Sequence, residues 1–380
     1  MTEPIAEVER LRRLFRLFGA TQCKGRSDVY EALSDGVAGD DRLLALLLET
    51  PGDQRRPSLL FACVNLLLAS NAGSELAAYY PIHRGRRAAD DQLLPIFSDF
   101  CDRHRVALLR LLRERSTQTN EIRRCVALHL GLDYVRRAWP GPFALVEIGA
   151  SAGLNLLFDR YRYRLGGRET GAVSAVVISS ELRGGHADSG LLGAAPRITS
   201  RLGIDQKPVD VTDPEARAWL EAFIWPEQVD ALATLRGALD LALAAPPRLV
   251  AGDATADTAR LLAELPGEEP VVVFTASLLS YLTRDARTAF LAQLREAARR
   301  RPVAWVFAEG PGLLATMDLS IPALSGALGR DTANYVVGAS LIGPRGPNDR
   351  LLAMADPYVR WLAPSRAADD DFQWLSDDIT

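Results

Sequence analysis

Four residues in the middle of the chain combine an acid with small side chains in a spacing that suits ligand binding. They follow the pattern acidic-x-Gly-x-Ser-x-Gly, formed by Glu147, Gly149, Ser151 and Gly153. A turn of such small residues lets a ligand approach backbone N–H groups closely. The apolar run before the turn predicts a buried strand, and a helix predicted over residues 154–163 would direct its positive N-terminal end at the same place. The stretch therefore predicts a cradle for a cofactor or an anion.

Two other interpretations of the same turn are open. A small-residue turn after a strand also arises where a helix packs closely on a sheet, with no ligand involved. Residues 149–153 also fit the Gly-x-Ser-x-Gly turn of serine hydrolases, in which Ser151 would be the nucleophile. That chemistry needs a histidine base after the serine, and the only later histidine is His186. The sequence therefore disfavours a hydrolase.

Two carboxylates follow predicted strands further along the chain. Asp253 comes directly after the apolar run 248–251, and ligands of open α/β sheets bind at the carboxyl ends of the strands. Asp253 would then lie beside a bound cofactor, and its alternative role is to cap a helix over residues 255–265. Glu181 is the other strand-end acid, and it either contacts ribose hydroxyls or pairs with Arg183.

Four further polar residues are placed to contact a substrate. Ser277 and Tyr281 follow the predicted strand 271–274, and loops at that edge face the substrate in this architecture, although packing is an equal alternative. Asn155 and Asp159 lie one turn apart on the helix that is predicted after the glycine turn. Their side chains would bring polar groups to the same pocket.

The composition argues against a metal ion and against a nucleic acid. The formal net charge is −4, whereas binding to a phosphate backbone requires a concentrated basic surface. The histidines are far apart in the sequence, and the cysteines form no Cys-x-x-Cys pair. We therefore expect no metal site and no nucleic-acid partner. The residues concerned are His83, His104, His129, His186, Cys23, Cys63, Cys101 and Cys125.

The sequence also bears on where the protein works. Three of the four cysteines lie in apolar helical patterns, as core thiols of a reducing compartment do. The N-terminus does not have the basic-then-apolar layout of a signal peptide, and no apolar run approaches the roughly 18 residues that a membrane span needs. These features predict a cytoplasmic protein that does not bind membranes.

The elements that position these residues fall into two parts. Residues 1–138 carry helical periodicity and are predicted as an all-helical lobe. From Pro142 onward, short β-branched runs alternate with helical stretches, which is typical of βαβ units and a mostly parallel sheet, over residues 143–364. A terminal antiparallel hairpin closes this sheet, and residues 365–380 are predicted as an acidic tail.

The order of these elements is that of an α/β protein of the class I methyltransferase type, a Rossmann-like fold. The predicted helices of the lobe span residues 5–18, 40–48, 57–69, 91–114 and 120–137, with Asp40 and Asn120 as N-caps of the second and last. The predicted strands span residues 144–148, 175–178, 248–251, 271–274, 303–307, 335–341 and 351–354, and the run 197–200 carries a weaker strand signal.

Several motifs occur together in the chain. They are Gln118-Thr-Asn-Glu121, Glu147-Ile-Gly-Ala-Ser-Ala-Gly-Leu-Asn-Leu156, Asp159-Arg-Tyr-Arg-Tyr163, Glu181-Leu-Arg-Gly-Gly185, Val209-Asp-Val-Thr-Asp-Pro214 and Trp225-Pro226. The glycine turn alone is similar to the first motif of S-adenosylmethionine-dependent methyltransferases. The whole combination, over nearly the entire chain, resembles an uncharacterised bacterial family, domain-of-unknown-function family 2332.

This resemblance implies a methyltransferase-like Rossmann domain behind a helical lobe. The polar residues that this resemblance implies as typical of the family are, in this chain, Gln118, Asn120, Glu121, Asn155, Asp159 and Asp213, here called the polar signature. Where the resemblance implies a histidine before a serine, the chain has Thr275-Ala276-Ser277, which indicates a specialised member without that general base. Proteins of this kind also resemble a component of the system that closes the aziridine ring of azinomycin-type antibiotics. There the fold works without methyl transfer, beside a second methyltransferase-like subunit.

The first functional hypothesis is a methyltransferase that acts on a small molecule in specialised metabolism and uses S-adenosylmethionine. The residues expected to hold this cofactor are Glu147, Gly149, Ser151, Gly153 and Asp253. The residues expected to contact the substrate are Gln118, Asn120, Asn155, Asp159, Ser277 and Tyr281.

Two alternatives use the same scaffold differently. In one, no cofactor is used, and an amine of the substrate displaces sulfate or a similar leaving group. Glu121 or Asp213 would take the proton of the amine, and arginine side chains would stabilise the anionic leaving group. In the other, the protein is not catalytic and only stabilises a catalytic partner. The assemblies expected are a homodimer or a heteromer with a second methyltransferase-like protein.

Overall fold

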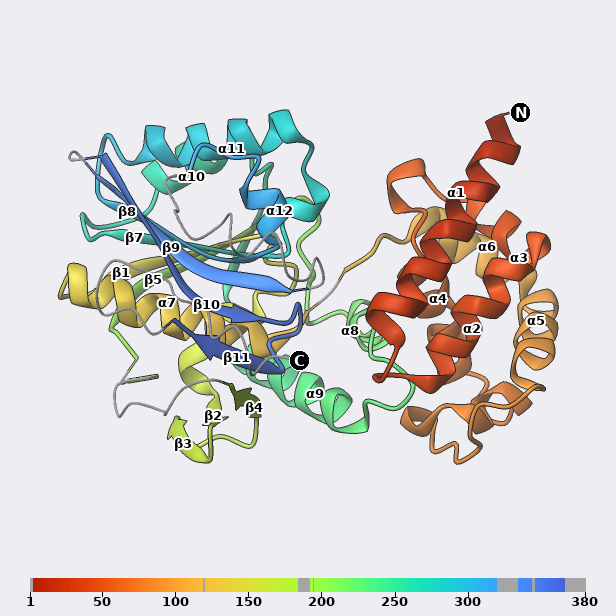
Figure 1. Cartoon of the computed structure of the whole chain (residues 1–380). Helices are drawn as coiled ribbons and strands as arrows, with labels where there is room; N and C mark the ends of the chain where they lie inside the picture. Colours follow the sequence, from red (N-terminus) through yellow and green to blue (C-terminus); the bar gives the residue numbers. More distant parts are fainter. Residues whose placement is uncertain are drawn as a thin grey trace. The chain divides into compact units, whose positions relative to one another are not determined.

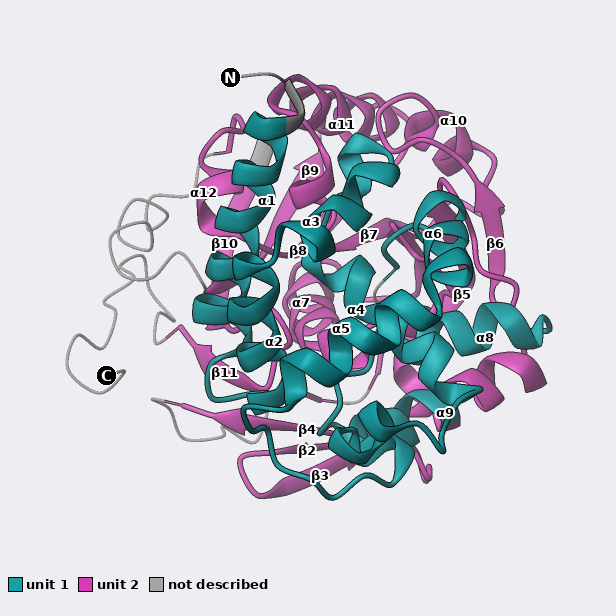
Figure 2. Ribbon diagram, turned by 90° about the vertical axis from the view of Figure 1, so that its right-hand side faces the viewer, with its two compact units in different colours: residues 1–119, 212–236 teal, residues 120–211, 237–380 magenta. Residues whose placement is uncertain are grey.

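The protein divides into two compact units, which Figure 2 distinguishes by colour. The computed structural model describes residues 3–118, 120–183, 192–193, 195–319, 334–343 and 346–365. One unit, here called the helical unit, comprises Met1–Thr119 and Thr212–Arg236. The other, called the sheet unit, comprises Asn120–Val211 and Gly237–Thr380. The division therefore differs from the boundary predicted at residues 138–143.

Helices account for the regular structure of the helical unit (Figure 1). They are α1 (Glu3–Phe18), α2 (Asp28–Gly39), α3 (Asp41–Leu46), α4 (Pro57–Ala69), α5 (Leu93–Arg103), α6 (Arg105–Glu114), α8 (Pro214–Glu221) and the beginning of α9 (Val229–Ala244). Short π or 3-10 segments lie between them at Gly19–Cys23, Leu47–Glu49, Gly52–Gln54, Glu75–Tyr79 and Pro81–His83. α1 and α4 confirm two predicted helices, whereas α2 is not among those predicted.

Helix ends in this unit follow local chemistry. Asp40 is confirmed as an N-cap, because its carboxylate accepts hydrogen bonds from the backbone N–H groups of Arg42 and Leu43 at the start of α3. The single helix predicted over residues 91–114 is wrong, since α5 and α6 are separate helices that meet at His104. The backbone of His104 leaves the helical region there, with φ −102° and ψ 17°.

Hydrogen bonds explain why residues 212–236 belong to the helical unit. α8 packs on α4, and the side-chain amide of Asn65 on α4 donates to the carbonyl oxygens of Ala222 (2.9 Å) and Ile224 (3.0 Å). Asn65 is only 2 % exposed, so the loss of these bonds would leave its buried NH2 group without the two acceptors. The return of the chain to this unit is a tertiary contact that sequence periodicity does not reveal.

The described strands of the sheet unit form an eleven-stranded sheet. Their order is β3-β2-β4-β11-β10-β9-β8-β7-β1-β5-β6. β6, β5, β1, β7 and β8 are parallel, and β9 is antiparallel to both β8 and β10. The strand order reverses between β1 and β7, because β5 and β6 lie on one side of β1 and the later strands β7, β8 and β9 lie on its other side. The strands are β1 (Phe143–Ile148), β2 (Arg162–Leu165), β3 (Arg168–Gly171), β4 (Val177–Leu182), β5 (Ile198–Asp205), β6 (Arg248–Ala251), β7 (Val271–Ala276), β8 (Val303–Glu309), β9 (Tyr335–Gly343), β10 (Gly346–Ala355) and β11 (Trp361–Pro364).

This architecture confirms the predicted α/β class with a mostly parallel sheet. β1, β6, β7, β8 and the hairpin of β9 and β10 correspond to predicted runs. β5 is longer than the weak run 197–200 and continues to Asp205, because it is a central strand whose Leu202 and Ile204 are buried. β2, β3 and β11 are not among the predicted strands. The turn residues 344–345 and the tail beyond Ser365 lie outside the described residues.

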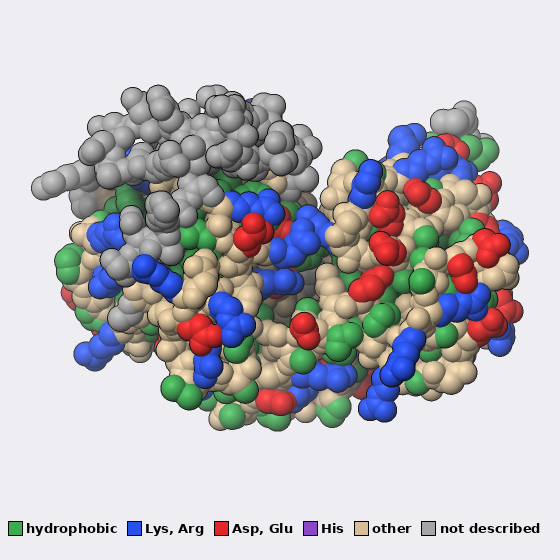
Figure 3. Space-filling view, turned by 60° about the horizontal axis from the view of Figure 1, so that its bottom comes forward, with side chains coloured by type: hydrophobic (Ala, Val, Ile, Leu, Met, Phe, Trp, Pro, Cys, Tyr) green, Lys and Arg blue, Asp and Glu red, His purple; other side chains and the backbone are tan. Residues whose placement is uncertain are grey.

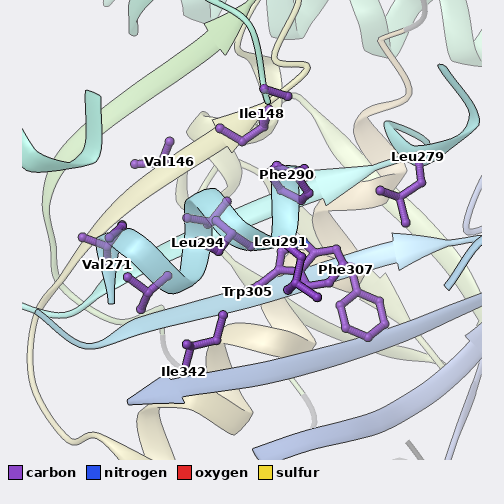
Figure 4. Close-up of a cluster of buried hydrophobic side chains, with 14 of the residues drawn as sticks. Val146, Ile148, Val271, Leu279, Phe290, Leu291, Leu294, Trp305, Phe307 and Ile342 are labelled. Atoms are coloured by element: carbon purple, nitrogen blue, oxygen red, sulfur yellow. The ribbon is translucent and has the colours of Figure 1, made fainter. Parts of the chain in front are cut away.

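Helices cover both faces of the central strands (Figure 1). On one face lie α10 (Thr258–Ala263) and α11 (Arg284–Ala297), and Figure 4 shows Phe290 of α11 packed on Trp305 of β8. On the other face, α7 (Cys125–Ala138) packs on β8 and β9. Gly131 of α7 lies so close to Val306 that a larger residue would collide with it. This packing places α7 in the sheet unit, although the sequence predicts it in the helical lobe.

The remaining short helical segments of the sheet unit lie at Ile122–Arg124, Leu154–Arg160, Leu279–Tyr281 and α12 (Pro311–Leu314). On the face drawn in Figure 3, acidic and basic side chains are intermixed over the described surface. Within the described ranges, no helix has both the length and the apolar character that a membrane span needs.

Candidate functional site

The glycine turn after β1 takes a left-handed backbone at three of its residues. The φ angles are 75° at Gly149, 49° at Ser151 and 69° at Gly153. Glycine adopts such angles readily, whereas a serine does so under strain of about 1–3 kcal/mol. The helix predicted over residues 154–163 is wrong, since the structure has only a short 3-10 segment, Leu154–Arg160. It stops there because the next residues pair as β2 with β4, and so short a segment offers no helix dipole to an anion.

Close packing also restricts the two glycines of the turn. A Cβ on Gly153 would lie 2.7 Å from Cγ of Pro247 and 2.9 Å from Cδ2 of Leu249. A Cβ on Gly149 would lie 3.2 Å from Cδ1 of Leu278. Packing against neighbouring strands is therefore sufficient to require glycine at 153, with or without a ligand.

Ser151 connects three segments of the sheet unit by hydrogen bonds. Its backbone N–H donates to Oδ2 of Asp205 at 2.8 Å, and its Oγ accepts from the amide of Asn120 at 2.8 Å. Asp205 is the last residue of β5, and its other oxygen accepts from the N–H of Lys207 at 2.8 Å. The sequence reasoning missed Asp205, although the run of alternating apolar residues that ends in this acid is visible in the sequence. It nominated Glu181 as the second strand-end acid.

Glu147 is a buried acid one residue before the end of β1. Its Oε1 accepts from Nδ2 of Asn155 at 2.6 Å, while Oε2 has no hydrogen-bond partner among the described residues. Burial raises the pKa of Glu147 to about 8, and the opposing effects of Asn155 and the Arg124 charge are smaller. The carboxyl is therefore largely protonated at neutral pH. The structure thus joins two of the nominated residues, Glu147 and Asn155, directly.

A second buried acid ends β8, two strands from β1. Glu309 accepts hydrogen bonds from the backbone N–H groups of Leu278 (2.9 Å) and Leu279 (3.2 Å), and burial raises its pKa to about 7. Arg124, which is itself buried, donates to the carbonyl oxygen of Ala276 at 3.3 Å, and its charge lowers the pKa of both Glu147 and Glu309. A buried cation therefore acts on two buried carboxyls. Neither Arg124 nor Glu309 was nominated.

Ser277 and Tyr281 follow β7, as predicted. Ser277 has a φ of 63°, and its Oγ lies 2.9 Å from Oη of Tyr335 at the start of β9. The side chain of Tyr281 is 45 % exposed. Tyr335 was not nominated, because nothing in the sequence relates it to a loop 58 residues earlier.

The two other strand-end acids differ in position. Asp253 follows β6, on the same side of the reversal as β5, and accepts from the N–H of Thr255 (2.7 Å) and from Nε2 of Gln206 (2.9 Å). The helix predicted from Thr255 begins later, as α10 after Asp257, so Asp253 stabilises a turn and is not a helix N-cap. Glu181 lies on β4, with five strands between it and β1, and pairs with Arg183 at 3.2 Å. It is therefore not near the reversal.

The polar signature residues are distributed over both units. Asn120 bonds to Ser151 and is not the predicted N-cap; Glu121 takes the capping role and also forms an ion pair with Arg123 at 3.0 Å. Asp159 pairs with Arg201 of β5 at 2.7 Å. Asp213 belongs to the helical unit, where it is the N-cap of α8 and accepts from the N–H of Glu215 at 2.9 Å. Gln118 also belongs to the helical unit.

The structure thus joins Asn120, Ser151, Glu147 and Asn155 into short hydrogen-bonded groups at the carboxyl end of β1. Within the ranges that the structure describes, no group of three or more His, Cys, Asp or Glu side chains is placed to hold a metal ion.

Comparison with known proteins identifies one family. A sequence model described as an uncharacterized protein conserved in bacteria (DUF2332) matches residues 12–363. A search of curated proteins finds no match. Because the family match covers most of the chain, including every residue of the site described above, the protein belongs to this bacterial family, DUF2332.

Proposed function

We propose that the protein is an S-adenosylmethionine-dependent methyltransferase that acts on a small molecule. The observation that carries this proposal is the row of three acids, Glu147, Asp205 and Asp253, at the carboxyl ends of the adjacent parallel strands β1, β5 and β6. The order β6-β5-β1-β7-β8 corresponds to 3-2-1-4-5 of a doubly wound sheet, in which nucleotide ligands bind at the reversal. The antiparallel hairpin beside β8 agrees with the class I methyltransferase arrangement that the sequence resembles.

The residues present fit such a cofactor. In doubly wound folds, an acid at the end of the second strand binds ribose hydroxyls, and Asp205 occupies that place. Each of its oxygens accepts one backbone N–H, and a carboxylate has about four lone-pair sites, so two acceptor sites remain. Asp253 would then lie beside the adenine ring, and the turn at Gly149 would approach the rest of the cofactor. When bound, S-adenosylmethionine supplies an electrophilic methyl group. The chain would supply mainly orientation of the two reactants.

Calorimetric titration with S-adenosylmethionine tests this proposal. We expect saturable binding to the wild type and affinity weaker by a factor of about ten to one hundred in Asp205→Asn, because a hydrogen bond to a charged group contributes about 1.5–3 kcal/mol. We expect Asp253→Ala to lose binding while it remains folded. If Asp253 only stabilises its turn, that variant should instead keep its affinity and lose about 1 kcal/mol of stability, the usual contribution of one hydrogen bond.

Asp40→Asn is the matched control for this titration, because Asp40 also accepts two backbone N–H groups but lies at the start of α3 in the helical unit. It should bind the cofactor as the wild type does. Absence of binding to the wild type at millimolar cofactor would refute the proposal.

A cofactor-independent substitution is the second candidate, and the hydrogen bonds of the turn favour it. The N–H and Oγ of Ser151 are both bonded within the protein, as is the amide of Asn155, so these groups are already engaged without a cofactor. In this reaction the amine nitrogen of the substrate attacks a carbon atom, the bond from that carbon to the leaving-group oxygen breaks, and the amine proton passes to a carboxylate. Glu121 is the nominated base in the sheet unit, where Arg123 holds it at 3.0 Å.

The probe for this second candidate is 2-aminoethyl hydrogen sulfate, with sulfate release followed by ion chromatography. Protein freed of any cofactor should release sulfate faster than buffer does, and Glu121→Gln should abolish the excess. Such turnover would exclude methyl transfer as the reaction of this site. If the wild type neither binds S-adenosylmethionine nor releases sulfate, the third hypothesis, a non-catalytic subunit that stabilises a partner, becomes the favoured one.

A further inference from the structure

Two hydroxyl groups meet at the carboxyl end of β7. The Oγ of Ser277 lies 2.9 Å from Oη of Tyr335, which comes from a different part of the chain. Ser277 has a φ of 63°, a left-handed conformation that strains a non-glycine residue. Such conformations persist only where the surroundings enforce them, and they cluster at functional sites. The strained backbone therefore makes Ser277, with its hydroxyl contact to Tyr335, a candidate functional residue.

Four hydrogen bonds hold the backbone at Ser277 and its neighbours, and they explain its conformation. Its own N–H donates to the carbonyl oxygen of Ala308 at 3.1 Å. The carboxyl of Glu309 accepts from the N–H groups of the two following residues at 2.9 and 3.2 Å. Arg124 donates to the carbonyl oxygen of Ala276, immediately before the serine, at 3.3 Å. Since Arg124 and Glu309 are both buried, the direction of the Ser277 side chain is set by the interior of the sheet unit.

Burial keeps the phenol of Tyr335 neutral, and several neighbouring groups modify this effect. The groups that act on Tyr335 are Arg124, Glu309, Ser277 and Tyr281. Burial raises the pKa of Tyr335, so its phenol stays protonated at neutral pH. The charge of Arg124 lowers this pKa, and Glu309 raises it when its carboxyl is ionised. A cationic ligand group would be repelled by Arg124, and an anionic group would be repelled by Glu309 in its ionised form.

The hydrogen-bonding capacity of the pair points to the kind of group that fits it. One hydrogen bond between two hydroxyls uses one of their two protons, so the pair retains one O–H donor together with acceptor lone pairs. An ammonium group only donates and a carboxylate only accepts. A hydroxyl group does both, and it carries no charge.

We propose that Ser277 and Tyr335 form a recognition site for a hydroxyl group, of an alcohol or a phenol, on the small-molecule substrate. The proposal rests on the proposed function, whose cofactor would bind at the neighbouring end of β1, and it adds the substrate class and Tyr335 as a contact. Ligands of open α/β sheets bind at this edge, beside the strand-order reversal. Ser277 and Tyr335 would orient the substrate, while Glu309 and Arg124 act only by positioning Ser277.

Fluorine NMR with 4-fluorophenol as the probe tests the proposal on the full-length protein. Fluorobenzene is the matched compound that lacks the hydroxyl group. We expect fluorine NMR to show that the wild type binds 4-fluorophenol more tightly than fluorobenzene. In a separate amide NMR spectrum of the protein, the probe should shift the backbone signals of residues 276–279. Ser277→Ala and Tyr335→Phe should each weaken 4-fluorophenol binding about fivefold, the equivalent of one hydrogen bond of about 1 kcal/mol, and leave fluorobenzene binding unchanged.

Two further variants control for folding. Ser277→Gly removes the hydroxyl and relieves the strained φ, so it should fold at least as well as the wild type and still bind the probe about fivefold more weakly. Tyr79→Phe removes a tyrosine hydroxyl that donates to Asp90 in the helical unit, and it should leave probe binding unchanged. Equal probe binding in the wild type and the Ser277 and Tyr335 variants would overturn the proposal, as would absence of binding to the wild type at millimolar probe.

A parallel titration of the wild type with S-adenosylmethionine separates the two proposals. Binding of 4-fluorophenol at residues 276–279 without any binding of S-adenosylmethionine would refute methyl transfer and keep the hydroxyl site. Binding of S-adenosylmethionine without hydroxyl-dependent binding of the probe would refute the hydroxyl site alone.

Discussion

Replacement of Arg124 by methionine is expected to lower the free energy of unfolding of the sheet unit by about 3–5 kcal/mol at pH 8, the usual loss when one partner of a buried charge group is removed. Arg124 is 8 % exposed, and its charge acts on two buried carboxyls, Glu147 and Glu309. Methionine keeps much of the apolar stem but leaves both carboxyls without their cation. The hydrogen bonds of Arg124 to the carbonyl oxygens of Ala276 and Pro357 are lost as well.

Amide hydrogen exchange of β1, β7 and β8 is the appropriate measurement, because it reports the stability of the sheet unit by itself. If the two units unfold separately, unfolding is not two-state, and a single free energy of unfolding for the whole protein is not defined. Arg123→Met is the matched control. Arg123 pairs with Glu121, and these side chains are 23 % and 17 % exposed, so solvent screens the pair and the loss should be about 1 kcal/mol. If Arg124→Met loses no more stability than Arg123→Met, the charge group around Arg124 is not an important contributor to stability.

The second large effect is a fall in the stability of the sheet unit as pH rises from about 4.5 to about 8. Burial raises the pKa of Glu147 from 4.5 to about 8 and that of Glu309 from 4.5 to about 7. In this window the folded state binds more protons than the unfolded state, so the free energy of unfolding decreases as pH increases. The contribution is complete below pH 4.5, is lost as pH passes through the folded pKa values, and levels off only about one pH unit above the folded pKa of Glu147. Because one pKa unit corresponds to about 1.4 kcal/mol, the combined loss should reach several kcal/mol.

Urea unfolding at a series of pH values, read out by hydrogen exchange of β1 and β8, measures this slope. Glu147→Gln and Glu309→Gln should each flatten it, because an amide of the same shape does not titrate. Glu7→Gln is the opposite control. The hydrogen bond from Arg10 lowers the pKa of Glu7 from 4.5 to about 2, so Glu7 contributes stability above pH 4.5 that the wild type loses as pH falls. This variant should therefore be less stable than the wild type at neutral pH, lose the difference in acid, and keep the decline between pH 5 and 8. A wild-type profile without a decline between pH 5 and 8 would contradict the pKa values of the buried acids.

Both predictions depend on the electrostatic interaction of the buried Arg124 with the buried acids Glu147 and Glu309. Arg124, Glu147 and Glu309 are buried at the ends of β1, β7 and β8, where a doubly wound sheet binds its ligand. Loss of Arg124 would raise the pKa of both acids further, so the destabilisation in Arg124→Met should grow with pH. A double variant, Arg124→Met with Glu147→Gln, should recover part of the lost stability.

Local patterns in the sequence determined the central strands and the residues that lie next to one another in the chain. The apolar runs of β1, β7 and β8 are visible because these strands are buried on both faces, which requires continuous apolar residues. The glycine turn is visible in the same stretch, and so are Glu147 and Asn155 as separate candidates, but the hydrogen bond between them was not predicted. Asp40 was predictable as a cap for the same reason, since a cap depends on its immediate neighbours.

Regular structure near an edge or a boundary was less predictable. The segment Leu154–Arg160 carries a helical pattern, yet the pairing of β2 with β4 ends it early. α7 has the sequence of an amphipathic helix like those of the helical unit, and only its contact with β8 and β9 assigns it to the sheet unit. Periodicity indicates that one face of a helix is buried, but it does not identify the surface that buries it.

Four residues of the candidate site were decided by tertiary structure alone. Asp205, Arg124, Glu309 and Tyr335 reach the end of β1 and β7 from four separate segments, and none of them belongs to a local motif. Their proximity arises because parallel strands bring their carboxyl ends to one edge of the sheet, in an order that the sequence does not state. The unusual pKa values have the same origin, since burial is a property of the assembled sheet and not of the residues one by one.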